Sequence, residues 1–175
     1  MERAAVPGTA SEVKLREWID QYAAVILKTC FVCLSDRTQA EDAMQDTFIK
    51  AWRHMDDLGR KGIRNEKAWL LRIAMNTCRD YRRTAWFRHV DARVALEGLP
   101  PRMMEATEED HDLMLTVCGL PDRYRQAILL YYYHGLTEQE TADVLGVSLS
   151  SVHRRLKKAE ALLRTALEGG ERHDG

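Results

Sequence analysis

The chain has 175 residues, 45% of them hydrophobic and 30% charged, with a formal net charge of −1 at pH 7. This balance is typical of a folded globular protein and argues against an intrinsically disordered one. No apolar run approaches the roughly 20 residues that a membrane-spanning helix needs, and the first eleven residues do not form a secretory signal, so we expect a cytoplasmic protein with no membrane insertion.

Acidic and basic residues are segregated along the chain although their totals nearly cancel. Residues 1–49 carry eight acidic and five basic side chains, and residues 50–93 carry twelve basic and five acidic ones. The balance reverses over residues 94–122, with seven acidic side chains against one basic. A basic block suggests a surface that faces phosphates, and an acidic neighbour suggests a linker or a partner site.

The first half of the chain is predicted to be helical. The chain has only 4 Pro and 10 Gly and few runs of β-branched residues. Apolar spacing predicts helices over residues 12–34, 38–55 and 66–84. Two glycines predict a loop over residues 57–62. We place a first small domain at residues 12–85.

Four cysteines raise the question of a metal or redox site. Cys30 and Cys33 form a C-x-x-C pair, a spacing used by both kinds of site. The pair lies within an apolar helical pattern, and no second pair or spaced histidines complete the about four ligands of a zinc site. We interpret the pair, with Cys78 and Cys118, as small buried hydrophobes, and expect no metal and no cofactor. The sequence leaves a redox or metal role of Cys30 and Cys33 open.

An acidic surface is predicted on the helix over residues 38–55. Glu41, Asp42 and Asp46 lie there, with Gln45 among them. No histidine or second carboxylate set accompanies them at metal-ligand spacing. The surface is therefore either a solvated face or a contact with another protein.

The helix over residues 66–84 carries a basic stripe. Arg72, Asn76, Arg79 and Arg83 follow each other at helical spacing, with Arg82 beside them. Guanidinium and amide groups in a row can follow a nucleic-acid backbone and hydrogen-bond an exposed base. The preceding stretch adds three cations that can reach a strand, Arg60, Lys61 and Arg64. The alternative is a helix face that arginines merely keep soluble.

The two halves are separated by a stretch that breaks regular structure. Residues 98–101 read Gly-Leu-Pro-Pro, and an acidic run poor in core residues follows. We predict a flexible linker over residues 86–110 and a second domain over residues 111–168. The predicted fold is all-α, with two small helical domains joined by that linker.

The span over residues 137–158 has the pattern of a helix-turn-helix. Thr137 can cap the first helix, with Glu140 at the capping-box position. Ala142 is small enough for a close helix crossing, and Gly146 suits a turn that needs positive φ. Val152 and Leu156 are expected to pack the second helix onto Val144 and Leu145.

The second helix of this motif has a polar and basic outer face. Short side chains at its start allow close approach to base edges in a major groove, while Arg and Lys reach phosphates. The alternative is an ordinary amphipathic hairpin with a solvated charged face. The predicted DNA-contacting residues are Ser148, Ser150, Ser151, His153, Arg154, Arg155, Lys157 and Lys158.

Three segments together resemble a known family. Residues 40–52 and 69–83 resemble region 2 of the sigma-70 family of bacterial transcription initiation factors. Residues 120–130 and the helix-turn-helix resemble region 4. Because no third domain intervenes, the chain resembles the extracytoplasmic-function (ECF) group of sigma factors. At four positions it differs from residues common in the family, so its promoter sequence is not predictable: Ser148, Ser150, Ser151 and His153.

The resemblance implies a role for each face. The residues implied to lie on or under the surface that grips the clamp helices of the RNA polymerase β′ subunit are Asp42, Gln45, Asp46 and Phe48. A second contact is implied with the flap of the β subunit, and an anti-sigma factor is expected as a further partner. The side chains implied to capture and melt the −10 element of promoter DNA are Arg60, Lys61, Arg64, Arg72, Asn76, Arg79, Arg82 and Arg83. The helix that starts near Ser150 would read the −35 element as duplex.

Two other classes of protein remain to be separated from this one. A stand-alone helix-turn-helix regulator would need a dimerisation or ligand domain, whereas the first half offers a basic helix and an acidic surface. An enzyme acting on nucleic acid would need a carboxylate metal cluster or a nucleophile beside a base, and no such set is evident. We therefore predict a sigma factor without a catalytic site.

Overall fold

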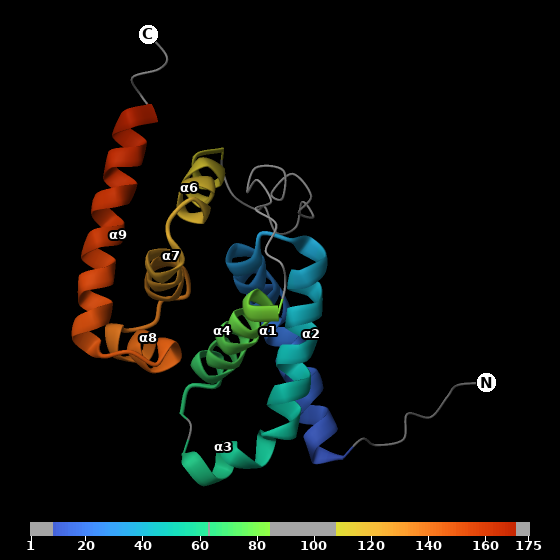
Figure 1. Cartoon of the computed structure of the whole chain (residues 1–175). Helices are drawn as coiled ribbons and strands as arrows, with labels where there is room; N and C mark the ends of the chain where they lie inside the picture. Colours follow the sequence, from blue (N-terminus) through green and yellow to red (C-terminus); the bar gives the residue numbers. More distant parts are fainter. Residues whose placement is uncertain (1–8, 63, 85–107, 171–175) are drawn as a thin grey trace.

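The computed structural model describes residues 9–62, 64–84 and 108–170, and the regular structure in these ranges is helical throughout. This confirms the all-α prediction (Figure 1). Residues 86–107 of the predicted linker lie outside the described residues. The elements are α1 (Ala10–Leu34), α2 (Arg37–Arg53), α3 (Met55–Lys61), α4 (Glu66–Thr84), α6 (Glu108–Cys118), α7 (Asp122–Ile128), the π-helical turn η2 (Leu129–Tyr133), α8 (Glu138–Leu145) and α9 (Leu149–Gly170).

Local hydrogen bonds set where the first two helices begin and end. Thr9 and Glu12 form a capping box at the start of α1, because each side chain accepts a hydrogen bond from the other residue's backbone N–H. Ser35 ends α1 in the left-handed region with φ 53°. The carboxylate of Asp36 then accepts from the backbone N–H of Gln39 at 2.8 Å and starts α2.

The segment predicted as a loop over residues 57–62 is mostly the short helix α3. Two acidic residues, Asp56 and Asp57, lie in its first turn, and Arg60 and Lys61 lie in its last. That order of charge complements the helix dipole. The left-handed Gly62 (φ 60°) ends the helix. The prediction was wrong because a glycine inside a helix costs only about 1 kcal/mol, which the favourable ends offset.

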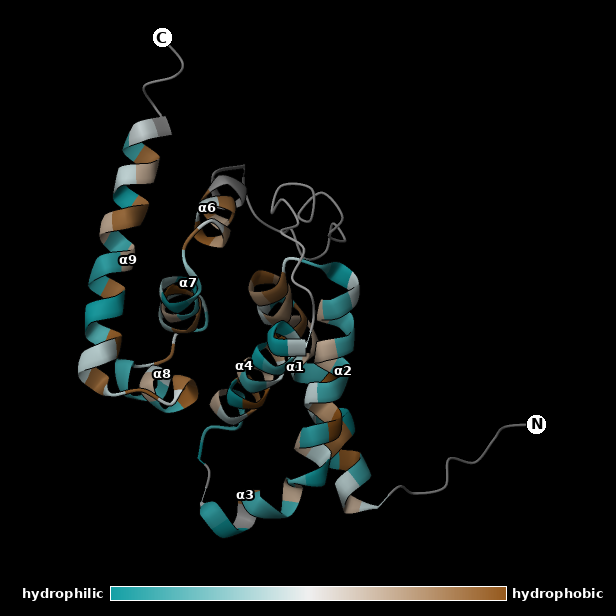
Figure 2. Ribbon diagram, in the orientation of Figure 1, coloured by the Kyte–Doolittle hydropathy of each residue, from teal (hydrophilic) through white to brown (hydrophobic). Residues whose placement is uncertain are grey.

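Helices α1, α2 and α4 form a bundle around one apolar core. Trp18 of α1 and Leu70, Leu71 and Met75 of α4 are almost completely buried in it. The brown apolar faces of these helices turn toward each other in Figure 2. The buried face of α4 consists of Leu70, Leu71, Ala74, Met75, Thr77 and Cys78.

The second half forms a smaller core of its own. Ala127 and Ile128 of α7 pack with Ala142 of α8 and with Val152 and Leu156 of α9. This cluster holds the helix-turn-helix to the helix before it.

The two halves also pack on each other. Val144 and Leu145 of α8 and Leu129 and Leu130 of η2 belong to the core cluster of the first bundle. Val152 and Leu156, which were predicted to pack onto Val144 and Leu145, belong to the second cluster instead. Helix α8 lies beside α4 (Figure 1). The prediction missed this contact because α8 has apolar residues on two faces, and a sequence does not say which partner each face meets.

Candidate nucleic-acid interface

The helix-turn-helix has the local geometry that its sequence predicts. The Thr137 hydroxyl oxygen accepts from the Glu140 backbone N–H at 3.1 Å, and the Glu140 carboxylate accepts from the Thr137 backbone N–H at 2.9 Å. Gly146 has φ 65° at the turn. The Ser148 hydroxyl then accepts from the backbone N–H of Ser151 at 3.2 Å and caps α9. These contacts set where α8 begins and ends and where α9 begins, and they confirm the motif.

Helix α9 separates a buried stripe from an exposed basic face. Val152, Leu156 and Ala159 are buried at 3% exposure or less. Of the eight predicted DNA-contacting residues, Ser151 and Arg155 are half-buried at the edge of this stripe. The other six are exposed: Ser148, Ser150, His153, Arg154, Lys157 and Lys158.

One exposed residue on this helix was not predicted. Leu149, in the first turn of α9, is 46% exposed although it is apolar. The sequence pattern does not single out Leu149, because an isolated leucine at a helix start is usually assigned to the core.

The predicted basic stripe of α4 is largely open to solvent. The exposed members of the predicted −10 set are Arg60, Lys61, Arg64, Arg72, Asn76, Arg79 and Arg83. The Asn76 amide oxygen accepts from a guanidinium nitrogen of Arg79 at 3.4 Å. Arg82 differs from the others, because it is half-buried and forms an ion pair with Asp122 of α7. Its guanidinium therefore ties the two halves of the chain together.

A groove of about 620 Å³ lies between this stripe and the helix-turn-helix. Trp69, Arg72 and Asn76 of α4 line one side, and Glu140 and Asp143 of α8 line the other. The groove thus places carboxylates of one half opposite the basic stripe of the other.

Asn65, directly before α4, makes a hydrogen bond across this groove. Its side-chain amide donates to a carboxylate oxygen of Glu140 at 2.8 Å. The pKa of Glu140 is lowered by the hydrogen bond from the Thr137 backbone and then by the one from Asn65. The ionised form of Glu140 is therefore the one that holds this contact.

Side chains of α4 hold the predicted acidic surface of α2 in place. Asp42 and Gln45 are exposed, whereas Phe48 lies in the core at 6% exposure. Asp46 is half-buried and accepts from the Tyr81 hydroxyl at 2.7 Å. Burial, and then the bond to Asp46, raises the pKa of Tyr81, which therefore stays protonated and able to donate.

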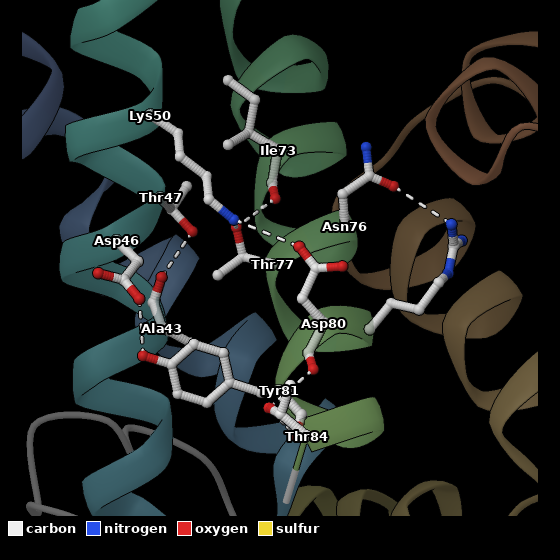
Figure 3. A network of polar contacts seen from close by, with 11 residues as sticks. Ala43, Asp46, Thr47, Lys50, Ile73, Asn76, Thr77, Asp80, Tyr81 and Thr84 are labelled. Carbon is white, nitrogen blue, oxygen red and sulfur yellow. Dashed lines mark hydrogen bonds and ion pairs between the residues drawn. The ribbon is translucent and has the colours of Figure 1, made fainter.

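Lys50 adds a second tie between the same two helices. Its ammonium group donates to the Thr77 hydroxyl at 3.1 Å and lies 3.5 Å from a carboxylate oxygen of Asp80. Figure 3 shows these contacts on the side of α4 that faces α2, with Asn76 on the opposite side. The acidic and basic faces are thus held at a fixed angle.

His134 forms a buried polar contact between the two halves. Its Nε2 lies 2.8 Å from the Thr29 hydroxyl oxygen, and Thr29 itself donates to the Val25 carbonyl at 2.7 Å. Because the hydroxyl proton is used there, Nε2 must carry the donated proton. The ammonium group of Lys67 also donates to the His134 carbonyl, at 3.0 Å. Burial, followed by the charges of Lys67 and Lys28, lowers the pKa of His134 to about 4.

The four cysteines are all buried with free thiols. The Cys33 sulfur lies 3.7 Å from that of Met75. A hydrogen bond with Cys78, and then burial, raises the pKa of Cys33 well above its usual value. Within the described ranges, no group of three or more histidine, cysteine or acidic side chains is arranged to hold a metal ion. The described helices include none that combines the length and apolar character needed to cross a membrane.

Known families account for both halves of the chain. The family described as "Sigma-70 region 2" matches residues 18–88, and "Sigma-70, region 4" matches residues 110–163. The ECF RNA polymerase sigma factor SigL of Mycobacterium tuberculosis is 30% identical over 172 residues, covering 96% of this chain and 97% of SigL. The chain belongs to the ECF sigma factor family. It is therefore a sigma factor that directs RNA polymerase to promoters.

Two further similarities agree with this family, and a third shows the same fold. SigW of Bacillus subtilis, another ECF sigma factor, is 30% identical, with 85% of this chain and 86% of SigW covered. The solved structure of CnrH in complex with the cytosolic domain of CnrY is 28% identical, with a TM-score of 0.66 and 90% of each chain covered. RpoE of Bartonella quintana, solved in complex with the anti-sigma factor NepR, shares the fold at a TM-score of 0.70 and 21% identity, with 89% of this chain and 97% of RpoE covered. A stand-alone regulator is not favoured, because the first half of this sigma factor is accounted for by region 2.

Proposed function

We propose that this sigma factor uses three separate faces: α2 for core polymerase, α3 and α4 for the −10 element, and α9 for the −35 element. The observation that carries the proposal is the capped, exposed recognition helix α9 in the same chain as the exposed basic stripe of α4. One chain therefore has two nucleic-acid surfaces, and the two have different chemistry.

The face on α9 suits duplex DNA. Ser148 and Ser150 are short and exposed at the start of the helix, so the backbone can come close to base edges. Arg154, Lys157 and Lys158 follow on the outer side and can reach phosphates. Each phosphate contact releases counterions, so −35 binding should weaken steeply as salt rises.

The face on α4 suits an unpaired strand. Asn76 presents an amide that can hydrogen-bond a base edge, and Arg72 and Arg79 flank it with charges for the backbone. Trp69 lines the adjoining groove and offers an aromatic surface. A site that binds flipped bases better than paired ones favours the open state of DNA without any bond being broken.

The face on α2 suits a protein partner. Asp42 and Gln45 are exposed on a helix that Tyr81 and Lys50 hold rigidly against α4. Asp46 and Phe48 lie beneath and fix that surface. We assign this face to the β′ clamp helices, and region 4 to the β flap.

This assignment describes a binding protein that acts in the cytoplasm, where polymerase and the chromosome are. It requires no cofactor and no catalytic residue, because the polymerase carries out the synthesis. We also propose an anti-sigma factor as a partner, since CnrH, to which this chain is 28% identical, has been solved with the cytosolic domain of CnrY.

The test is run-off transcription by core polymerase and the purified chain on a library of genomic fragments, followed by footprinting on the selected promoters. Three paired substitutions separate the faces: Asp42→Ala with Gln45→Ala, Arg72→Ala with Asn76→Ala, and Ser150→Ala with Arg154→Ala. Glu17→Ala, at an exposed position of α1 outside all three faces, is the control.

Each pair should fail at a different step. The α2 pair should lose stable association with core polymerase. The α4 pair should bind polymerase and promoter but leave thymines near −10 unreactive to permanganate. The α9 pair should lose protection at −35. If the α2 pair binds core polymerase as well as the control does, or if the α4 and α9 pairs fail at the same step, the assignment of faces is wrong.

A further inference from the structure

Leu149 is an apolar side chain in an otherwise polar part of the recognition helix. It is in the first turn of α9, between Ser148 and Ser150, and is 46% exposed. The buried stripe of this helix begins at Val152, which is fully covered. Leu149 therefore lies at the edge of the packed surface and contributes little to holding the helix in place.

The neighbours of Leu149 allow it to approach DNA closely. Ser148 and Ser150 on either side of it are exposed and shorter than leucine, and their hydroxyl oxygens lie 3.2 Å apart. His153, four residues on, shares this side of the helix and is exposed. Its ring nitrogen Nδ1 lies 3.3 Å from a Glu138 carboxylate oxygen of α8, which draws the imidazole toward the first helix of the motif.

A major groove offers one apolar group on its base edges. Adenine, guanine and cytosine present hydrogen-bond donors and acceptors there, whereas thymine also presents a C5 methyl group. A leucine side chain makes no hydrogen bond, so it can select among bases only through that methyl group. Water leaves both apolar surfaces when they meet, which favours thymine over the other bases.

We propose that Leu149 is a specificity-determining residue that contacts the methyl group of a thymine in the −35 element. This inference rests on the proposed function of α9 and adds a chemical rule for one base position. The contact requires thymine on one strand at that position. At base pairs that face only the serines, we expect thymine and deoxyuridine to be bound equally well.

The test replaces single thymines by deoxyuridine, which removes the methyl group and leaves the base-pairing edge unchanged. Core polymerase carrying the full chain first selects its −35 sequence from a library randomised in that region. Each thymine of the selected element, on either strand, is then replaced in turn and the affinity of the holoenzyme is measured.

One position should respond to the replacement. The wild-type chain should lose about fourfold in affinity there, as expected for one methyl group removed from water. Leu149→Ala should bind thymine and deoxyuridine at that position equally. Leu167→Ala is the matched control, because Leu167 is also 46% exposed on α9 but lies near its other end. That variant should behave as the wild type does.

The inference is overturned if wild-type holoenzyme binds both bases equally at every position, or if Leu149→Ala keeps the discrimination. A failure of the proposed function looks different, since the selection would then return no −35 preference at all. Thermal melting of the free Leu149→Ala chain should match that of Leu167→Ala, which excludes a folding defect as the cause of lost discrimination.

Discussion

Two polar residues join parts of the chain that lie far apart in the sequence. His134 contacts Thr29, 105 positions away. Arg82, one of the residues predicted to contact the −10 element, pairs with Asp122, forty positions along the chain. The sequence pattern indicates neither pairing, whereas it does indicate the cap at Thr137 and the turn at Gly146, which depend on residues within nine positions.

His134 should make stability depend on pH. The folded state holds the imidazole neutral with a pKa of about 4, whereas an exposed histidine has a pKa of about 6.5. The unfolded state therefore binds more protons between these values, and stability falls as pH drops below 6.5. Between pH 7.5 and pH 5 the free energy of unfolding should fall by about 2 kcal/mol from this group.

Urea unfolding at the two pH values measures this loss. His134→Gln should remove it, because glutamine can still donate to Thr29 and does not titrate. His54→Gln, at an exposed histidine of the turn before α3, is the control and should keep the wild-type difference. An equal fall in wild type and His134→Gln would show that other groups carry the pH dependence.

Among the helices, those with one buried face were predicted well, and those with two buried faces were predicted less well. Helix α4 was placed at residues 66–84, as observed, because its apolar and basic sides are clearly separated. Helix α3 was missed because its glycines suggested a loop. Helix α8 was placed correctly, yet the partner of Val144 and Leu145 was not, since short helices with two apolar faces fit more than one neighbour.

The turn of the helix-turn-helix should be sensitive to a single methyl group. Gly146 has φ 65°, and a Cβ added there would meet nothing within 4 Å. The cost of Gly146→Ala is therefore conformational rather than steric, about 1–2 kcal/mol. For a chain of this size, that should lower the melting temperature by about 2–8 °C. Binding of the −35 element should weaken as the turn distorts.

A second glycine provides the comparison for this measurement. Gly169 lies near the end of α9, and a Cβ there also meets nothing within 4 Å. Its φ is not in the left-handed region, so Gly169→Ala should be neutral or slightly stabilising. If the two variants melt at the same temperature, the positive φ of Gly146 does not contribute to the stability of the turn.

The two halves that carry the proposed nucleic-acid faces pack against each other. Asn65 contacts Glu140, Lys67 contacts the His134 carbonyl, and apolar residues of α8 join the first core. The names of the −10 and −35 elements give their positions on the promoter, about 25 base pairs apart. That separation is about 85 Å of duplex. While the two halves stay packed together, the proposed faces on α4 and α9 cannot reach two elements that lie so far apart, because a folded chain of this length has a radius of gyration of about 16 Å.

We therefore expect this sigma factor to separate its two halves when it binds polymerase and promoter. The 23 residues from 85 to 107 connect the halves, and a chain of that length can reach about 80 Å when extended. The contacts that must break include the ion pair between Arg82 and Asp122 and the buried bond between His134 and Thr29.

Resonance energy transfer between two fluorescent labels measures this separation of the halves. Asp20→Cys on α1 and Glu168→Cys on α9 place labels at exposed positions of the two halves, and the native cysteines are buried and should label slowly. Asp20→Cys with Thr38→Cys, within the first half, is the control pair. Transfer between the halves should be high in the free chain and fall on addition of core polymerase and promoter DNA, while the control pair stays constant. Unchanged transfer between the halves in a complex that starts transcription would show that the halves stay packed together.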